Sequence, residues 1–157
     1  MKLNWKQIAL GVLTYFGLVI CLIAVVVVGL FLREAIAGRS LEEMDENTAE
    51  TTSMLILYIV VDLLTLPVGA YVAAARSNSR KSAVVHACVM AAISTAIINL
   101  MYLVYSEPSP LWYNVLSYGL ILPAAFLGGL WRWRNLQRQH RELQAPQSPL
   151  PEVPRPL

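Results

Sequence analysis

Residues 8–32, IALGVLTYFGLVICLIAVVVVGLFL, form a run of 25 residues without a charge. As a helix this run is about 37 Å long, whereas the hydrocarbon core of a bilayer is roughly 30 Å thick. The apolar region of a cleaved signal peptide is much shorter, about 7–15 residues. Arg33 and Glu34 also separate the run from Ala35-Ile36-Ala37, which looks like a cleavage site. We therefore expect a retained helix that crosses a membrane.

Three further apolar runs follow along the chain. Residues 54–75 contain Asp62 as their single charge, residues 83–105 contain His86 near their start, and residues 111–131 are uncharged. The chain is 57% hydrophobic and 14% charged, against about 45–50% and 25% in soluble domains. The sequence predicts an all-α membrane protein with four transmembrane helices and no separate water-soluble catalytic domain.

The regions between and after these runs complete the predicted organisation. Residues 1–144 form one transmembrane domain, with an outer loop at 33–53 and a basic helical extension at 132–144. The loop carries six acids, which suit a lid that attracts cations or docks a partner, or a solvated connector. Residues 145–157 contain five prolines and are expected to form a disordered cytoplasmic tail.

The distribution of basic residues predicts the orientation. With the N-terminus inside, the cytoplasmic side holds ten of the twelve Lys and Arg residues and the outside holds Arg33 and Arg39. Because cytoplasmic loops of membrane proteins are enriched in Lys and Arg, both termini are expected in the cytoplasm.

The second and fourth spans resemble each other. Leu66-Pro67 and Leu122-Pro123 each lie within a span, and an arginine follows nine residues after each proline, at Arg76 and Arg132. The chain is therefore interpreted as two helical hairpins in parallel repetition, although proline is tolerated in membrane helices and arginine ends many of them.

Small residues recur at a spacing of four in the inner halves of spans two, three and four. Such spacing lets helices approach closely within lipid. The residues predicted to pack helices together are Gly69, Ala73, Ala87, Ala91, Ala124 and Gly128. The first span is rich in Val and Ile, and we expect it to face lipid more than the other spans do.

Asp62 is the residue that most needs a partner inside the membrane. An acid near the centre of a span costs about 2.5–3.5 kcal/mol on insertion scales and should face protein or water. Counting depth along each span predicts one intramembrane polar cluster, formed by Asp62, Tyr58, Thr95, Asn99 and Ser117. This cluster is either a proton or ion site or a structural group that fixes helix register.

Basic residues gather at the cytoplasmic ends of the spans. They predict a face that binds anionic lipid headgroups or a partner, formed by Arg76, Arg80, Lys81, His86, Arg132, Arg134 and Arg138. Cys21 and Cys88 lie on different spans, and the two histidines are not clustered with other ligands. No catalytic motif, cofactor site, metal site or nucleic-acid motif is recognised, so we do not expect an enzyme.

The run Gly69-Ala70-Tyr71-Val72-Ala73-Ala74-Ala75-Arg76, followed by a short basic loop and His86-Ala87, carries a resemblance. It resembles an element of small four-helix bacterial membrane proteins of unknown function. In these, Gly-Gly-Tyr-x-Ala-Ala-Arg ends the second helix and His-Gly opens the third. The resemblance covers about 20 residues, with Val68 at the position of the first glycine and Ala87 after the histidine. It implies a location in the bacterial inner membrane and brings no assigned activity.

These features favour a non-enzymatic accessory or assembly subunit of a membrane complex. A second hypothesis is a homo-oligomeric translocator of an ion or small solute that uses Asp62. A third is a membrane protein that binds anionic lipid through its basic face. The expected partners are accordingly the bilayer with its anionic headgroups, and another membrane protein or further copies of this chain.

Overall fold

The computed structural model describes residues 3–36, 52–105 and 110–144. In these residues the chain forms α1 (Trp5–Ile36), α2 (Thr52–Ala73), α3 (Arg80–Tyr105) and α4 (Leu111–Gln144), and no strand. All four helices are long and apolar enough to cross a membrane. The predicted all-helical architecture with four candidate spans is confirmed. The loop residues 37–51 and the tail 145–157 lie outside the described residues, and the orientation of the termini and the internal repeat stay predictions.

The helix ends differ in detail from the expected spans. Helix α1 continues past the apolar run to Ile36, and α4 continues through the basic segment to Gln144. Helix α2 ends at Ala73, two residues early, because the chain tightens there into a turn. In that turn the Ala75 N–H donates to the Val72 carbonyl over three residues rather than four, at 3.0 Å.

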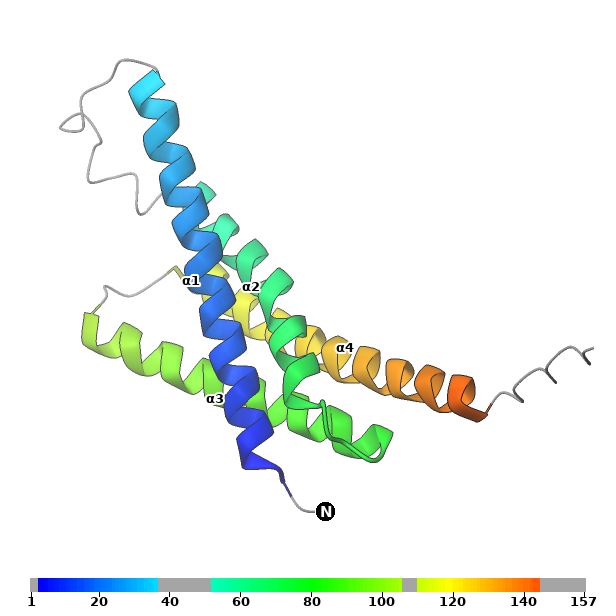
Figure 1. Ribbon diagram of the computed structural model, residues 1–157. Coiled ribbons are helices and arrows are strands. Elements are labelled where there is room, and N and C mark those ends of the chain that lie inside the picture. The colour runs from blue at the N-terminus through cyan, green and yellow to red at the C-terminus, as the bar shows by residue number, and fades with distance from the viewer. Residues whose placement is uncertain (1–2, 37–51, 106–109, 145–157) are drawn as a thin grey trace, which may run out of the picture.

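Helix α2 is the central element of the bundle. It packs against α1, α3 and α4, and α1 also contacts α3. Figure 1 shows α1 and α2 running side by side while α3 and α4 cross them. Helix α3 contacts all three other helices as well, and its largest contact is with α4.

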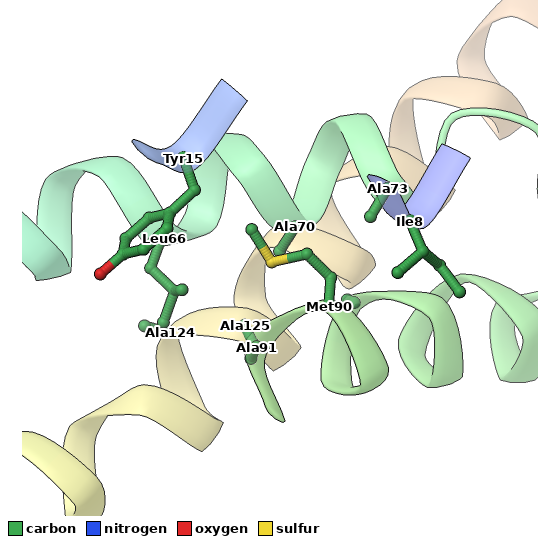
Figure 2. Packing of buried hydrophobic residues seen from close by; sticks show 10 residues of the cluster. Ile8, Tyr15, Leu66, Ala70, Ala73, Met90, Ala91, Ala124 and Ala125 are labelled. Atoms are coloured by element: carbon green, nitrogen blue, oxygen red, sulfur yellow. The ribbon is translucent and has the colours of Figure 1, made fainter. Parts of the chain in front are cut away.

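The core of this bundle consists mainly of small side chains. Six of its ten buried residues are alanines, and Met90 of α3 lies between them, close to Ala70 of α2 in Figure 2. The remaining members are larger and come from α1 and α2: Ile8, Tyr15 and Leu66. Small side chains bring the helix axes close together, which is how helices associate where lipid removes the hydrophobic driving force.

Two glycines mark where the helices touch. A Cβ atom placed on Gly11 of α1 falls 2.7 Å from the Gly69 carbonyl oxygen of α2. A Cβ atom placed on Gly128 of α4 falls on the Pro67 carbonyl oxygen and 2.8 Å from the Ala70 Cβ atom. The backbones of α1 and α4 thus both approach α2 within the same stretch, from Pro67 to Ala73.

The first span is only partly exposed. In its second half the side chains point away from the bundle, with Val25 68% exposed and Val28 56% exposed. In its first half Ile8, Gly11 and Tyr15 are buried. The first span is the least buried of the four, so the expectation that it faces lipid more than the others is confirmed. Its first half nevertheless carries a packing face on α2, formed by Gly11 and the residues one turn to either side of it.

Candidate functional site

Asp62 of α2 has a hydrogen-bond partner on α1. The Tyr15 hydroxyl donates to the Asp62 Oδ1 atom at 2.7 Å. Tyr15 is 2% exposed and lies one helical turn beyond Gly11, at the level where α1 touches α2. The close approach of the two backbones thus brings the phenol within reach of the acid. Tyr15 was not among the predicted partners of Asp62, which lie on the second, third and fourth spans.

A small cavity lies on the other side of Asp62, between α2 and α4. Its volume is about 10 Å³, and Asp62 and Ser117 are the polar residues in its lining. The Ser117 Oγ atom is buried without a hydrogen-bond partner. A cavity of roughly this size holds one water molecule at most. Asp62 and Ser117 therefore share a site that suits a single water or a transferred proton.

The remaining members of the predicted polar cluster lie elsewhere. Thr95 and Asn99 of α3 line a groove of about 380 Å³ between α3 and α4, together with Tyr118 of α4. The Tyr118 hydroxyl donates to the Asn99 Oδ1 atom, and the Thr95 hydroxyl donates to the Ala91 carbonyl of its own helix at 2.9 Å. Tyr58 is half-buried on α2, one turn before Asp62.

The structure thus divides the predicted cluster between two faces of α4. Ser117 and Tyr118 are neighbours in sequence, and neighbouring side chains on a helix point about 100° apart. Ser117 lines the cavity against α2, whereas Tyr118 lines the groove against α3. Counting residues along each span predicted that these side chains lie at the same depth in the membrane. It could not predict which face of its helix each side chain occupies.

Two of the predicted basic residues act inside the fold. The Arg132 guanidinium donates to the Ala75 carbonyl through Nη2 at 2.7 Å and through Nε at 3.2 Å. It also lies 5.4 Å from the centre of the Tyr71 ring, and Nη1 donates to the Tyr71 hydroxyl at 3.3 Å. Arg132 of α4 therefore caps the C-terminal end of α2. A basic side chain near the end of a helix is well placed to bond its last carbonyls.

His86 joins α3 to the start of α1. The Asn4 backbone N–H donates to the His86 Nε2 atom at 2.9 Å, so this nitrogen carries no proton. The opposite nitrogen, Nδ1, lies 2.8 Å from the Ser82 carbonyl oxygen and donates to it. His86 is 4% exposed and has both ring nitrogens bonded, so it is a brace between helices. The other predicted basic residues are exposed: Arg76, Arg80, Lys81, Arg134 and Arg138.

The predicted packing residues Gly69, Ala73, Ala87, Ala91, Ala124 and Gly128 are all buried. Gly11 of the first span is also a packing residue. In the sequence, the spacing of four residues between Gly11 and Tyr15 indicates that the two share one face of a helix. In the described part of the chain, no three His, Cys, Asp or Glu residues gather as metal ligands. Cys21 is exposed and Cys88 half-buried, and both are free thiols.

Comparison with known proteins gives no match for this chain, whether to a protein-family model, to a curated protein or to a solved structure.

Proposed function

We propose that this protein is a non-enzymatic accessory or assembly subunit of a membrane complex, and that a helix of its partner packs into the α3–α4 groove. The observation that carries this proposal is the hydrogen-bonded pair of Tyr118 and Asn99. Tyr118 is 45% exposed although it belongs to a candidate membrane span. Polar side chains within spans normally face protein or water rather than lipid.

The groove is also lined by small residues, which a helix partner can approach closely. Ala92 and Ala96 of α3 are exposed and lie one turn apart beside the polar pair. Small residues at this spacing allow the backbone of a second helix to approach. The Tyr118 bond uses the carbonyl oxygen of the Asn99 amide and leaves the two N–H donors of that amide for a bond to a partner. A lipid tail offers no acceptor to these donors.

Photo-crosslinking in the native membrane tests this proposal. A photoreactive amino acid at position 96 should give a discrete adduct with one partner protein. The same amino acid at position 28, which is exposed on α1, is the control and should give no discrete adduct. Asn99→Leu should weaken the association by about 1–2 kcal/mol, or roughly five- to thirty-fold, if the amide bonds across the interface. Equal, diffuse labelling from positions 96 and 28 would contradict the proposal.

A second candidate function rests on a different observation. Asp62 accepts a hydrogen bond from Tyr15 and shares one small cavity with the unpartnered hydroxyl of Ser117. This arrangement supports the hypothesis of a proton or cation site in a homo-oligomeric translocator. A single bundle of 17.4 kDa has little room for a pathway of its own, so this function requires several copies.

The location is part of the same proposal. The distribution of Lys and Arg supports cytoplasmic termini, and the resemblance of residues 69–87 supports the bacterial inner membrane. We further propose that the loop at 33–53 lies on the side of the membrane opposite the two termini.

A further inference from the structure

A large cavity lies at the end of the bundle where α1 and α3 begin. Its volume is about 610 Å³, within the range of roughly 300–1,000 Å³ typical of small-molecule sites. Trp5 and Lys6 come from α1, Arg76, Asn78 and Ser79 from the α2–α3 connection, and Ser82 from the first turn of α3. Three separate parts of the chain therefore build its wall.

This cavity lies where three of the candidate membrane spans end. The candidate spans of α1 and α3 begin at Trp5 and Arg80, and that of α2 ends at Ala73, so all three terminate beside it. Trp5 is exposed at its edge, and tryptophan is enriched at the level of lipid headgroups. A ligand in the cavity would lie at headgroup depth.

The cavity is positively charged. Lys6 and Arg76 are its charged lining residues, and no acid is among the side chains that form its wall in the described residues. The starts of α1 and α3 add N–H groups without intrahelical acceptors and the positive ends of two helix dipoles. Both features favour an anion, and guanidinium and ammonium groups bond phosphate oxygens strongly.

The wall is held in shape before any ligand arrives. The bond from the Asn4 N–H to His86 Nε2 ties the start of α1 to α3 at 2.9 Å. At the start of α3 the Ser79 hydroxyl oxygen accepts the Ser82 N–H at 3.2 Å. Since both nitrogens of His86 are bonded within the fold, Lys6 and Arg76 are the groups that can meet an anion.

The α2–α3 connection also contains a buried hydroxyl group without a hydrogen-bond partner. Arg76 and Asn78 line a second cavity of about 340 Å³, on the side of α4, together with Ser77. Ser77 is 6% exposed, and its Oγ atom has no hydrogen-bond partner. A buried hydroxyl without a partner is costly. Ser77 lines this second cavity and not the cavity of about 610 Å³, whereas Arg76 and Asn78 line both.

We propose that this end of the bundle binds the phosphate headgroup of an anionic phospholipid, with the phosphate between Lys6 and Arg76. The site is independent of the α3–α4 groove, which lies on α3 and α4 further along the spans. An anionic lipid bound here bridges α1, the α2–α3 connection and the start of α3. Its position suggests that the lipid holds these three segments together.

Native mass spectrometry of the full chain in an uncharged detergent tests the site, because such a micelle has no anionic surface. Phosphatidylglycerol and phosphatidylcholine with identical acyl chains are titrated separately. We expect phosphatidylglycerol to bind more tightly. The double variant Lys6→Gln/Arg76→Gln should lose this preference, with a fall in phosphatidylglycerol affinity of roughly 30-fold at about 1 kcal/mol per basic group.

The double variant Lys81→Gln/Arg138→Gln is the matched control, because it removes the same charge from exposed residues outside the cavity. It should retain most of the affinity. An equal loss in both double variants, or no preference for phosphatidylglycerol in the parent protein, would overturn the proposal. Displacement of the lipid by millimolar inorganic phosphate would show that the site takes a free phosphate and would overturn the assignment to lipid. Circular dichroism of each variant verifies that it is folded.

Discussion

Gly128→Ala is expected to destabilise the bundle by about 1–3 kcal/mol, the usual cost of adding atoms to a packed core. The new Cβ atom would fall on the Pro67 carbonyl oxygen and 2.8 Å from the Ala70 Cβ atom. Neither atom is the end of a flexible side chain, so α4 must move away from α2. Gly128→Val should cost more, because it adds two further methyl groups at the same contact. Thermal unfolding in detergent, followed by circular dichroism, measures the change.

Gly119→Ala is the matched control on the same helix. A Cβ atom placed on Gly119 meets nothing within 4 Å. Alanine is the better helix former by about 1 kcal/mol, so this variant should be as stable as the parent or slightly more stable. If the two alanine variants unfold at the same temperature, α4 does not contact α2 through Gly128 as described.

Tyr15→Phe is expected to cost about 1–3 kcal/mol, because it leaves the Asp62 oxygen without its donor while the ring still fills the core. Asp62→Asn should cost much less, since the asparagine carbonyl keeps an acceptor oxygen of the same size facing Tyr15. Combining the two changes should cost less than the sum of the separate effects, because both act on one hydrogen bond. Additive effects would mean that the Tyr15–Asp62 bond contributes nothing.

The same pair of variants tests the second candidate function. If Asp62 exchanges a proton or a cation during transport, Asp62→Asn abolishes flux in proteoliposomes while insertion and folding remain intact. Tyr15→Phe retains the carboxyl group and should slow the flux without abolishing it. Full flux in the Asp62→Asn protein would exclude Asp62 as a coupling residue.

The membrane spans could be predicted from the sequence because uncharged runs of more than 20 residues have few other structural solutions. The surface through which α1 and α2 pack together could not be predicted from the sequence. The valines at 25–28 dominate the first span and indicate lipid contact, whereas its packing face consists of separated residues such as Gly11 and Tyr15. Only the packing of α1 beside α2 brings Tyr15 and Asp62 together.

For the polar residues, too, the sequence indicates the depth of a side chain in the membrane but not the direction in which it points from its helix. Counting residues from the end of each span placed Ser117 and Asn99 at similar depths, and both were assigned to one cluster with Asp62. Direction depends on how each helix is rotated against its neighbours, which small packing residues determine. Because α4 contacts α2 through Gly128 and α3 through Gly129, its polar residues are divided between two faces.

The basic residues have different roles in the fold because their surroundings differ, although their side chains are of the same type. Arg132 and Arg76 each follow a proline by nine residues, yet Arg132 bonds the Ala75 carbonyl and Arg76 is exposed beside a cavity. The sequence identifies where the membrane ends, since arginine is placed there in both cases. Whether an arginine is bonded within the fold depends on whether a helix end lies within its reach.

Native mass spectrometry of the protein, extracted gently from its own membrane, tests the central claim most directly. A subunit that packs through the α3–α4 groove should appear as a complex with a second membrane protein at a fixed ratio. Asn99→Leu should reduce the amount of that complex. A closed assembly of identical chains would contradict the accessory role and favour transport through Asp62. A monomer that carries only lipid would contradict both functions.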